Sequence, residues 1–427
     1  MMVRQSVLTS VLPLVLLAGC SCPSTVGRTQ RDMVLHQLRV VAKSSNYYWA
    51  WTSPWLKDWD PKGDPRFVIP DGDGFRSKPT DEVELSCSYQ QYAGGRRTVI
   101  NYADLCAITG TWHEDRYYQI NRAGLAAAVR RQWQEFGGLM VFSWHMDHPY
   151  CSFGYKKDSY RFKSEGENRN VIRQILDGTG GPCGTDTLGA RARRTPCANP
   201  REWFFKSLKD VADFFNSLVD EKTGQKIPVV VRYPHECDGD WFWWGRTWCS
   251  ADEYRRFCRQ EADYLRNACG EGQILFAYTP DRTWREFGRE GDSENTFLAY
   301  YAGDAYVDIL GLDDYSIGNG DDVKVETNYR ETLRKLRVMT KFAEARNKVV
   351  AIAESGGKTR RDDFWRYLHR LASAEGVSVA YVNTWSWIYG TTPQNERSKQ
   401  EEIAFAARPQ VLMEGSGMGF RKVCNER

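Results

Sequence analysis

Two glutamates follow directly on apolar, β-branched segments of the sequence. Glu236 comes after the run 227–233, and Glu354 comes after the wholly apolar run 349–353, before a Ser-Gly-Gly turn. A pair of carboxylic acids at a fixed separation can divide acid–base and nucleophilic chemistry. One acid protonates a leaving oxygen, while the other attacks carbon or activates water, as in the cleavage of glycosidic bonds. A salt-bridged strand terminus is the structural alternative for each.

Imidazole and indole side chains accompany these acids. His235 immediately precedes Glu236, Trp241 opens an aromatic run that extends to residue 244, and His145 ends the segment 139–145. We assign all three to a binding cleft, although a lone histidine such as His145 is often a hydrogen-bonded core residue. The pair His235-Glu236 is not a zinc-protease motif, because that motif needs a histidine where Gly239 stands. We therefore expect no metal and no cofactor.

Polar and aromatic residues also end two later apolar runs. Asp313, Asp314 and Tyr315 follow the run 307–312, and Trp385 ends the run 379–385. Of the two aspartates, we expect one to serve the site and the other to have a structural role. We place Asp313, Tyr315 and Trp385 among the substrate-binding residues.

The elements that must position these residues alternate regularly along the chain. Short β-branched or aromatic runs predict eight strands, at 47–51, 105–109, 139–144, 227–233, 274–278, 307–312, 349–353 and 379–385. Amphipathic segments at 123–136, 203–218, 252–268, 330–345 and 362–374 predict helices between them. This alternation favours a single (β/α)8 TIM barrel over an open doubly wound sheet, since no GxGxxG follows the first strand. Active sites of such barrels lie at the carboxyl ends of the strands.

The composition agrees with a folded, sugar-handling chain. The 427 residues are 41% hydrophobic and 26% charged, which excludes disordered, collagen-like and polytopic membrane classes. A net charge of +3 without basic clusters argues against nucleic acid as a partner. The 16 tryptophans, 22 tyrosines and 19 phenylalanines suit a sugar-binding cleft, with a bulky core as the alternative. We expect a monomer.

The N-terminal residues are interpreted as an export signal. One arginine and a short apolar run, 7–17, lead to the sequence Leu-Ala-Gly-Cys at 17–20, which resembles the lipobox of bacterial lipoproteins. We predict a signal peptide over 1–19, lipidation of Cys20, a tether over 20–42 and a catalytic domain over 43–427. The protein would then be lipid-anchored in the bacterial cell envelope, with no other membrane contact. An ordinary secretory signal is the alternative.

Twelve cysteines are compatible with an exported protein but do not define a pairing. No CxxC motif is present, and the histidine and cysteine spacing does not suit zinc. Cys183 and Cys197 flank a loop that a disulfide could close, whereas Cys106, Cys258 and Cys269 lie in apolar segments typical of buried thiols. The long connection from 149 to 199 is expected to extend the cleft, with a surface insertion as the alternative.

The segment 228–245, which contains both His235 and Glu236, is similar to the fourth strand and following loop of glycoside hydrolase family 26. The segments 142–145, 207–215, 307–315 and 351–356 fit the same family, and the resemblance covers roughly residues 43 to 410. The family consists mainly of endo-β-1,4-mannanases on a (β/α)8 barrel. A histidine directly before the acid/base glutamate separates it from relatives that use asparagine there.

The resemblance implies a role for each candidate residue. Glu236 would be the acid/base and Glu354 the nucleophile of a retaining double displacement. The other residues would act as follows: His235 bonds near the acid/base or the sugar, Tyr315 holds the nucleophile, Trp385 is the platform under the sugar, and Trp241 with His145 lines adjacent positions. The substrate would be the backbone of mannan, glucomannan or galactomannan.

Two residues depart from the family pattern. Ser386 stands where several family mannanases have an arginine after the platform tryptophan, and Cys237 stands where methionine is common. The family also contains enzymes that act on mixed-linkage β-glucan and β-1,3-xylan, so these substrates stay open. A non-catalytic, glycan-binding lipoprotein is a further alternative, although a binding protein has no need of both glutamates.

Replacing Cys20 tests the predicted anchor. A mature protein that carries several acyl chains should partition into membranes, because stable anchoring takes more than one chain. Cys20→Ser should release soluble protein or leave an uncleaved precursor, measured by fractionation and by the mass of the N-terminal peptide. Wild-type protein that is soluble after export would contradict the anchor.

Overall fold

The structure is a computed structural model, and it describes eleven stretches of the chain. These are residues 29–52, 54–56, 83–85, 96–109, 122–150, 170–183, 197–286, 289–290, 294–357, 363–385 and 396–420. The predicted signal peptide, Cys20 and Ser386 lie outside the described residues.

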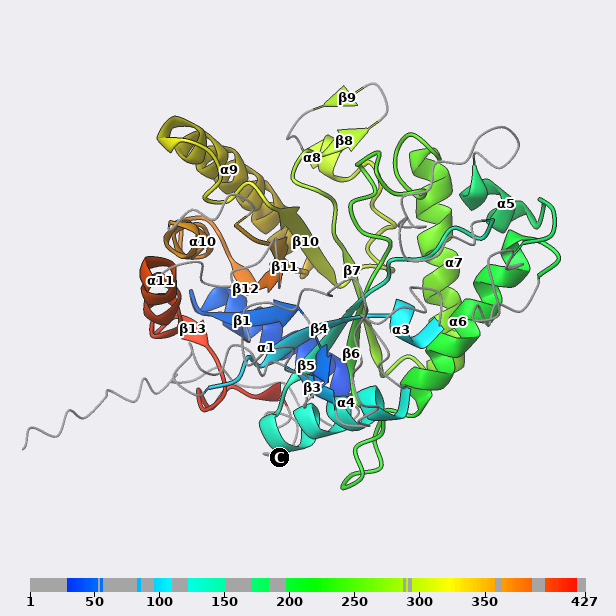
Figure 1. The fold of residues 1–427 in the computed structure, drawn as a ribbon, viewed down its shortest axis with the longest axis horizontal. Coiled ribbons are helices and arrows are strands. Elements are labelled where there is room, and N and C mark those ends of the chain that lie inside the picture. Colours follow the sequence, from blue (N-terminus) through cyan, green and yellow to red (C-terminus); the bar gives the residue numbers. More distant parts are fainter. Residues whose placement is uncertain are drawn as a thin grey trace, which may run out of the picture.

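Eight parallel strands close into a barrel at the centre of the molecule (Figure 1). They are β1 (Tyr47–Thr52), β4 (Ile100–Asp104), β5 (Leu139–Ser143), β6 (Val229–Arg232), β7 (Ile274–Tyr278), β10 (Ile309–Asp314), β11 (Val349–Ser355) and β12 (Val379–Trp385). Each strand pairs with the next in this order, and β12 pairs with β1 from Tyr48↔Tyr381 to Thr52↔Trp385. The predicted (β/α)8 barrel is confirmed.

Helices surround the barrel (Figure 1). The outer helices are α4 (Arg122–Phe136), α6 (Pro200–Asn216), α7 (Ala251–Cys269), α9 (Asp322–Arg346), α10 (Phe364–Ala372) and α11 (Glu396–Ala406). Shorter elements lie in the connections: α3 (Cys106–Thr109), α5 (Val171–Asp177), α8 (Glu294–Phe297), β2 (Pro54–Leu56), β3 (Val83–Leu85), β8 (Arg285–Glu286), β9 (Arg289–Glu290) and β13 (Val411–Leu412). Of the helices in the described part of the chain, none has the length and apolar character needed to cross a bilayer.

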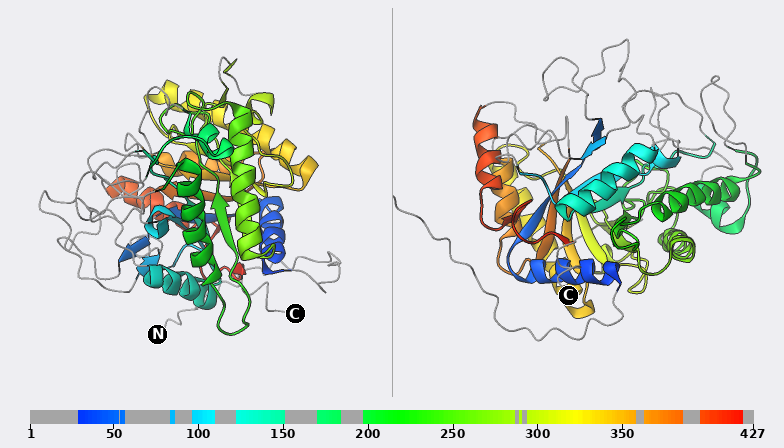
Figure 2. Two further views of the ribbon diagram at one scale, coloured as in Figure 1. Left: turned by 90° about the vertical axis from the view of Figure 1, so that its right-hand side faces the viewer. Right: turned by 90° about the horizontal axis from the view of Figure 1, so that it is seen from below.

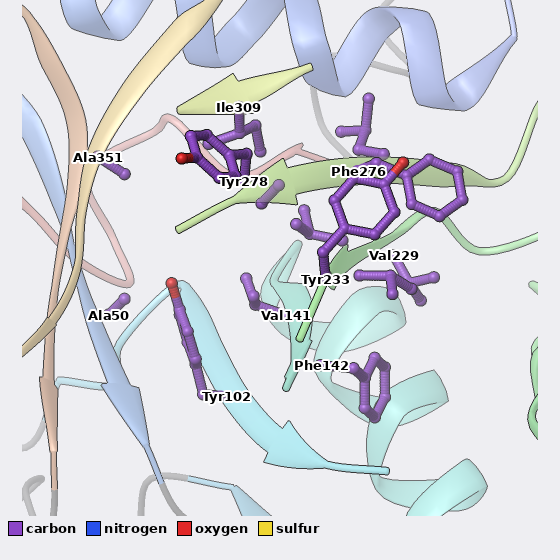
Figure 3. Close-up of a cluster of buried hydrophobic side chains, with 14 of the residues drawn as sticks. Ala50, Tyr102, Val141, Phe142, Val229, Tyr233, Phe276, Tyr278, Ile309 and Ala351 are labelled. Atoms are coloured by element: carbon purple, nitrogen blue, oxygen red, sulfur yellow. The ribbon is translucent and has the colours of Figure 1, made fainter. Parts of the chain in front are cut away.

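The barrel strands are buried on both faces, which explains their near-continuous apolar sequences. Phe142 of β5 packs outward, with its ring 5.4 Å from that of Phe215 on α6. Tyr102 of β4 and Tyr381 of β12 meet across the barrel, with ring centroids 6.3 Å apart. Figure 3 shows such large side chains beside small ones, among them Ala50 and Ala351. Large and small side chains alternate so that the layers fill the interior.

The second predicted strand is wrong in position. Residues 105–109 do not form a strand; the strand is β4 (Ile100–Asp104), and α3 (Cys106–Thr109) follows it. Asn101 obscured the strand, since a polar residue is unusual in a fully buried one. The Asn101 side-chain oxygen accepts a hydrogen bond from the nearby Thr98 hydroxyl at 2.9 Å, so its burial is compensated locally. The short apolar runs on either side of such a residue cannot be assigned to a strand or to a helix by periodicity alone.

The folded domain begins earlier than the sequence predicts. Residues 30–42, expected in the tether, belong to α1 (Gln30–Lys43), which starts at a capping box between Thr29 and Asp32. Val34, Leu38 and Val41 are fully buried on one face of this helix. Figure 2 shows α1 in blue beside the barrel. It lies at the opposite end from the glutamates, because Arg31 donates to the Ile274 carbonyl at the start of β7.

Glu261 on α7 is a buried carboxyl group in the helix layer. It is fully buried, and neither of its oxygens has a hydrogen-bond partner among the described residues. Burial raises the pKa of Glu261 to about 8. The native state therefore holds a proton on this group at pH values where the unfolded chain has already lost it.

The free energy of unfolding should consequently fall as the pH rises from about 4.3, the unfolded value, towards 8. Glu261→Gln should flatten this slope by about 1.4 kcal/mol per pH unit, since one proton is no longer released on unfolding. Denaturant titrations at several pH values measure the slope. The exposed residue Glu271 provides the control, because Glu271→Gln should leave the slope unchanged. Equal slopes in wild type and Glu261→Gln would contradict the assignment.

Candidate active site

The two predicted glutamates meet at the carboxyl ends of the strands. Glu354 is near the end of β11 and lies opposite Asp313 of β10, after a register shift between Leu312 and Asp313. Glu236 lies beyond the end of β6, where its N–H donates to the Thr279 carbonyl at 2.9 Å. One carboxylate oxygen from each of Glu236, Asp313 and Glu354 lies within 4.8 Å of the others. Residues far apart in the sequence thus form one carboxylate cluster.

An arginine that the sequence analysis did not single out lies beneath this cluster. Arg232, the last residue of β6, is fully buried and pairs with Glu354 through one nitrogen and with Asp313 through the other, at 2.5 Å. Burial alone disfavours its charge, but Asp313 and Glu354 together raise the pKa of Arg232 well above its usual range. The guanidinium is therefore a fixed cation. Its signal in the sequence is a charged residue at the end of the apolar run 229–231.

The structure gives the two adjacent aspartates different surroundings. Asp313 is fully buried and ion-paired with Arg232, beneath the glutamates, and its predicted role in substrate binding stays a prediction. Asp314 accepts from the backbone N–H of Ser316 at 2.7 Å and from the Thr332 hydroxyl at 2.5 Å. Asp314 thus fixes the turn after β10 to helix α9, as expected of a structural partner.

Each glutamate receives a hydrogen bond from an aromatic side chain. The Trp241 indole N–H donates to Glu236 Oε2 at 2.5 Å, and the Tyr315 hydroxyl donates to Glu354 Oε2 at 2.9 Å. These donors tie the predicted substrate-binding residues Trp241 and Tyr315 directly to the carboxylates. Glu354 also accepts a charge-assisted hydrogen bond from Arg232.

Glu236 is in a different electrostatic environment. Burial raises the pKa of Glu236 well above its usual range, and the negative charges of Glu354 and Asp281 raise it further. The Trp241 hydrogen bond and the Arg232 charge oppose this shift and are the smaller effects. Glu236 therefore retains its proton to a higher pH than an ordinary glutamate. A carboxyl group with a raised pKa can serve as an acid beside a second carboxyl group.

The rings of His145, His235 and Trp385 form a group, and His235 directly precedes Glu236. The His145 ring lies 4.6 Å from the His235 ring and 6.2 Å from that of Trp385, centroid to centroid. Asp104, at the end of β4, accepts from the His145 backbone N–H at 3.2 Å and contacts its ring Nδ1. Asp104 was missed because the strand that carries it was misplaced. Burial, with His145 and Arg232 nearby, lowers the pKa of His235 well below its usual range, so that ring is neutral.

The aromatic run after Glu236 has mainly a structural role. Trp243 donates its N–H to the Met146 carbonyl at 2.9 Å, and Trp244 donates to the His235 carbonyl at 2.8 Å. Both tryptophans are buried, and Trp244 stacks on Phe242 at 4.5 Å. Core packing therefore accounts for these rings, and Trp241 is the member of the run that contacts Glu236.

The long connection between β5 and α6 is described only in part. Its helix α5 docks on α7, where Asn170 donates to Glu253 Oε2 at 3.0 Å and Arg173 donates to Oε1 at 2.5 Å. Residues 151–169 and 184–196 lie outside the described residues. An extension of the cleft by this connection stays a prediction.

A (β/α)8 barrel with two close carboxyl groups and aromatic side chains at the carboxyl ends of its strands has the architecture of a glycoside hydrolase. Comparison with known proteins agrees with this class. Residues 194–402 match the model of glycosyl hydrolase family 26. A mannan endo-1,4-beta-mannosidase of Bifidobacterium adolescentis is 36% identical over 175 residues, which cover 38% of this chain and 17% of the relative. That of Bacillus subtilis strain 168 is 31% identical over 114 residues, which cover 25% and 28%. The matched segments thus span less than a third of either relative.

Solved structures share the barrel over most of its length. A family 26 beta-mannanase from Bacteroides ovatus has a TM-score of 0.67 at 20% identity, covering 92% of this chain and 96% of that one. A modular endo-beta-1,4-mannanase from Cellulomonas fimi has a TM-score of 0.65 at 21% identity, covering 91% and 76%. At this level of identity the likeness shows the fold. The segment 194–402, which contains both glutamates, belongs to glycoside hydrolase family 26.

Proposed function

We propose that this protein hydrolyses the backbone of β-1,4-mannan-type polysaccharides with retention of configuration. The observation that carries the proposal is the close approach of Glu236 and Glu354: one carboxylate oxygen of each lies within 4.8 Å of the other, and the pKa of Glu236 is raised well above its usual range. Retaining enzymes hold their two carboxyl groups about 5–5.5 Å apart, and inverting enzymes leave about 6.5–9.5 Å for a water molecule. The observed spacing supports the retaining pathway.

In the first step, Glu354 attacks the anomeric carbon while Glu236 protonates the departing glycosidic oxygen. Arg232 and Tyr315 hold the attacking carboxylate in position, through a charge pair and a 2.9 Å hydrogen bond. Formation of the glycosyl-enzyme ester removes the negative charge of Glu354, which raised the pKa of Glu236. The pKa of Glu236 then falls, and the same group can take a proton from the water that hydrolyses the ester.

The mannan specificity is supported by the two relatives named above, both mannan endo-1,4-beta-mannosidases. Mannose differs from glucose by its axial O2, so a cleft that contacts this hydroxyl discriminates between the two sugars. His145, whose ring contacts Asp104 and lies 6.2 Å from that of Trp385, is our candidate for this contact.

A panel of polysaccharides tests the substrate. We expect cleavage of β-1,4-mannan or glucomannan to be faster than cleavage of any all-glucose polymer by at least about tenfold, the effect of one interaction worth about 1.4 kcal/mol. Initial rates of reducing-end release on mannan, glucomannan, mixed-linkage β-glucan and β-1,3-xylan provide the measurement. A higher rate on mixed-linkage glucan or on xylan would assign the protein to that specificity.

Azide separates the roles of the two glutamates. Glu236→Ala loses proton transfer, which contributes a factor of about 10²–10⁴ to the rate. The dinitrophenolate group of a dinitrophenyl glycoside departs without a proton, so the glycosyl ester of Glu354 should still form and should accumulate, because no base activates water. Azide should convert this ester to a β-glycosyl azide with retained configuration, identified by NMR. Glu354→Ala should not form this product. Retained azide from Glu354→Ala, with inverted product from Glu236→Ala, would reverse the assignment.

The charges around Glu236 predict a pH dependence. Asp281→Asn removes a negative charge that raises the pKa of Glu236, so the alkaline limb of the kcat/KM profile should move to lower pH. Trp241→Phe removes a hydrogen bond that lowers this pKa, so the limb should move to higher pH. The exposed residue Asp240 supplies the control, and Asp240→Asn should leave the limb in place. Shifts in the same direction for Asp281→Asn and Trp241→Phe would show that Glu236 does not control the limb.

A further inference from the structure

Two cysteines face each other at the base of the loop between α5 and α6. Cys183 and Cys197 form an antiparallel bridge, in which each backbone N–H donates to the carbonyl of the other residue at 2.9 Å. In such a hydrogen-bonded pair the Cα atoms are about 5.5 Å apart, and directly opposed side chains lie on the same face. Disulfides most often join Cα atoms about 5.5–6 Å apart. The Cα separation of this pair is therefore one that an S–S bond can span.

Both sides of this pair are fixed by the surrounding structure. On the first side, Gly180 has a φ of +94°, and a Cβ there would lie 2.4 Å from the Tyr150 hydroxyl and 3.0 Å from Pro200, so the chain passes closely over the start of α6. On the second side, Asn199 caps α6 by accepting from the Glu202 N–H at 3.0 Å. An S–S bond would add a covalent link between two segments that are already held in register.

The structure shows both residues as thiols, 1% and 4% exposed. Burial, with the neighbouring Cys197, raises the pKa of Cys183 to about 12, and burial also raises the pKa of Cys197. Once packed in the reduced form, the pair has little thiolate, which is the reactive species. Oxidation is therefore expected during folding, before α5 and α6 close over the pair.

We propose that Cys183 and Cys197 form a disulfide that closes the loop 184–196 at its base. The oxidant is the disulfide form of a thiol oxidoreductase. The thiolate of one cysteine attacks that disulfide to give a mixed disulfide, and the second cysteine then attacks it. The protein gains one S–S bond and loses two protons and two electrons, and the oxidoreductase leaves as a dithiol. This proposal does not depend on the proposed function.

The sequence allows a direct test, because trypsin separates the two residues. Cleavage after Arg173, Arg191, Arg194 and Arg201 gives the peptides 174–191 and 195–201, each with a single cysteine. The full chain is expressed with its own leader in an export-competent bacterium, alkylated in denaturant without reductant, and digested. We expect the two peptides to be recovered covalently joined and to separate on reduction. Recovery of both peptides singly and alkylated, or of either joined to another cysteine, would overturn the proposal.

Variants provide an independent measurement. Cys183→Ala, Cys197→Ala and the double variant should lower the thermal unfolding midpoint equally, and reductant should bring the wild type to the same value. Cys269→Ala is the matched control, because Cys269 is a buried thiol on α7 whose Sγ contacts the Ala212 carbonyl. In Cys269→Ala, reductant should still lower the thermal unfolding midpoint as it does in the wild type. A wild-type midpoint that is the same with and without reductant and equal to that of the double variant would count against a stabilising cross-link.

Discussion

The buried charge of Arg232 organises the carboxyl end of the barrel. From β6, its guanidinium reaches Ser143 on β5, Thr279 just after β7, Asp313 on β10 and Glu354 on β11. A buried charge is costly unless it is paired and its hydrogen bonds are satisfied. These partners, which come from four other strands of the barrel, meet that requirement. The arginine thus fixes the relative positions of strand ends that would otherwise be joined only by backbone pairing.

The same cation determines how many protons the cluster holds. Glu236, Asp313 and Glu354 would carry three negative charges against one positive charge if all were ionised. Burial and the negative charges of its neighbours raise the pKa of Glu236 well above its usual range. Burial also raises the pKa of Asp313, and the Arg232 charge opposes that shift. Glu354 has both Arg232 and Tyr315 as donors. The negative charge of Glu354 is one of the causes that raise the pKa of Glu236, so loss of that charge would lower the proton affinity of Glu236.

Some features of this site could be predicted from the sequence, and others could not. The barrel and the two glutamates could be predicted, because the strand–helix alternation is local and the carboxyl ends of parallel strands meet at one face. Arg232 could not be assigned, since its burial depends on partners 81 and 122 positions away in the chain. Asp104 could not be assigned because its strand was predicted in the wrong place. Helix α1 was assigned to a tether because it follows the predicted export signal. Trp243 and Trp244 had the composition of a binding cleft but pack in the core.

The position of Glu236 depends on the compact turn that follows it. Glu236 has a φ of +52°, a conformation that is uncommon for residues other than glycine. Its carbonyl accepts from the Gly239 N–H, and the Gly239 carbonyl accepts from the Arg246 N–H, so the turn closes on itself. A Cβ at Gly245 would lie 2.4 Å from the Gly239 oxygen, so the turn has no room for a larger residue there. Trp241 projects from this turn back to Glu236 at 2.5 Å. The aromatic segment therefore supports one carboxyl group, and a fixed carboxyl group is what the proposed proton transfer from Glu236 requires.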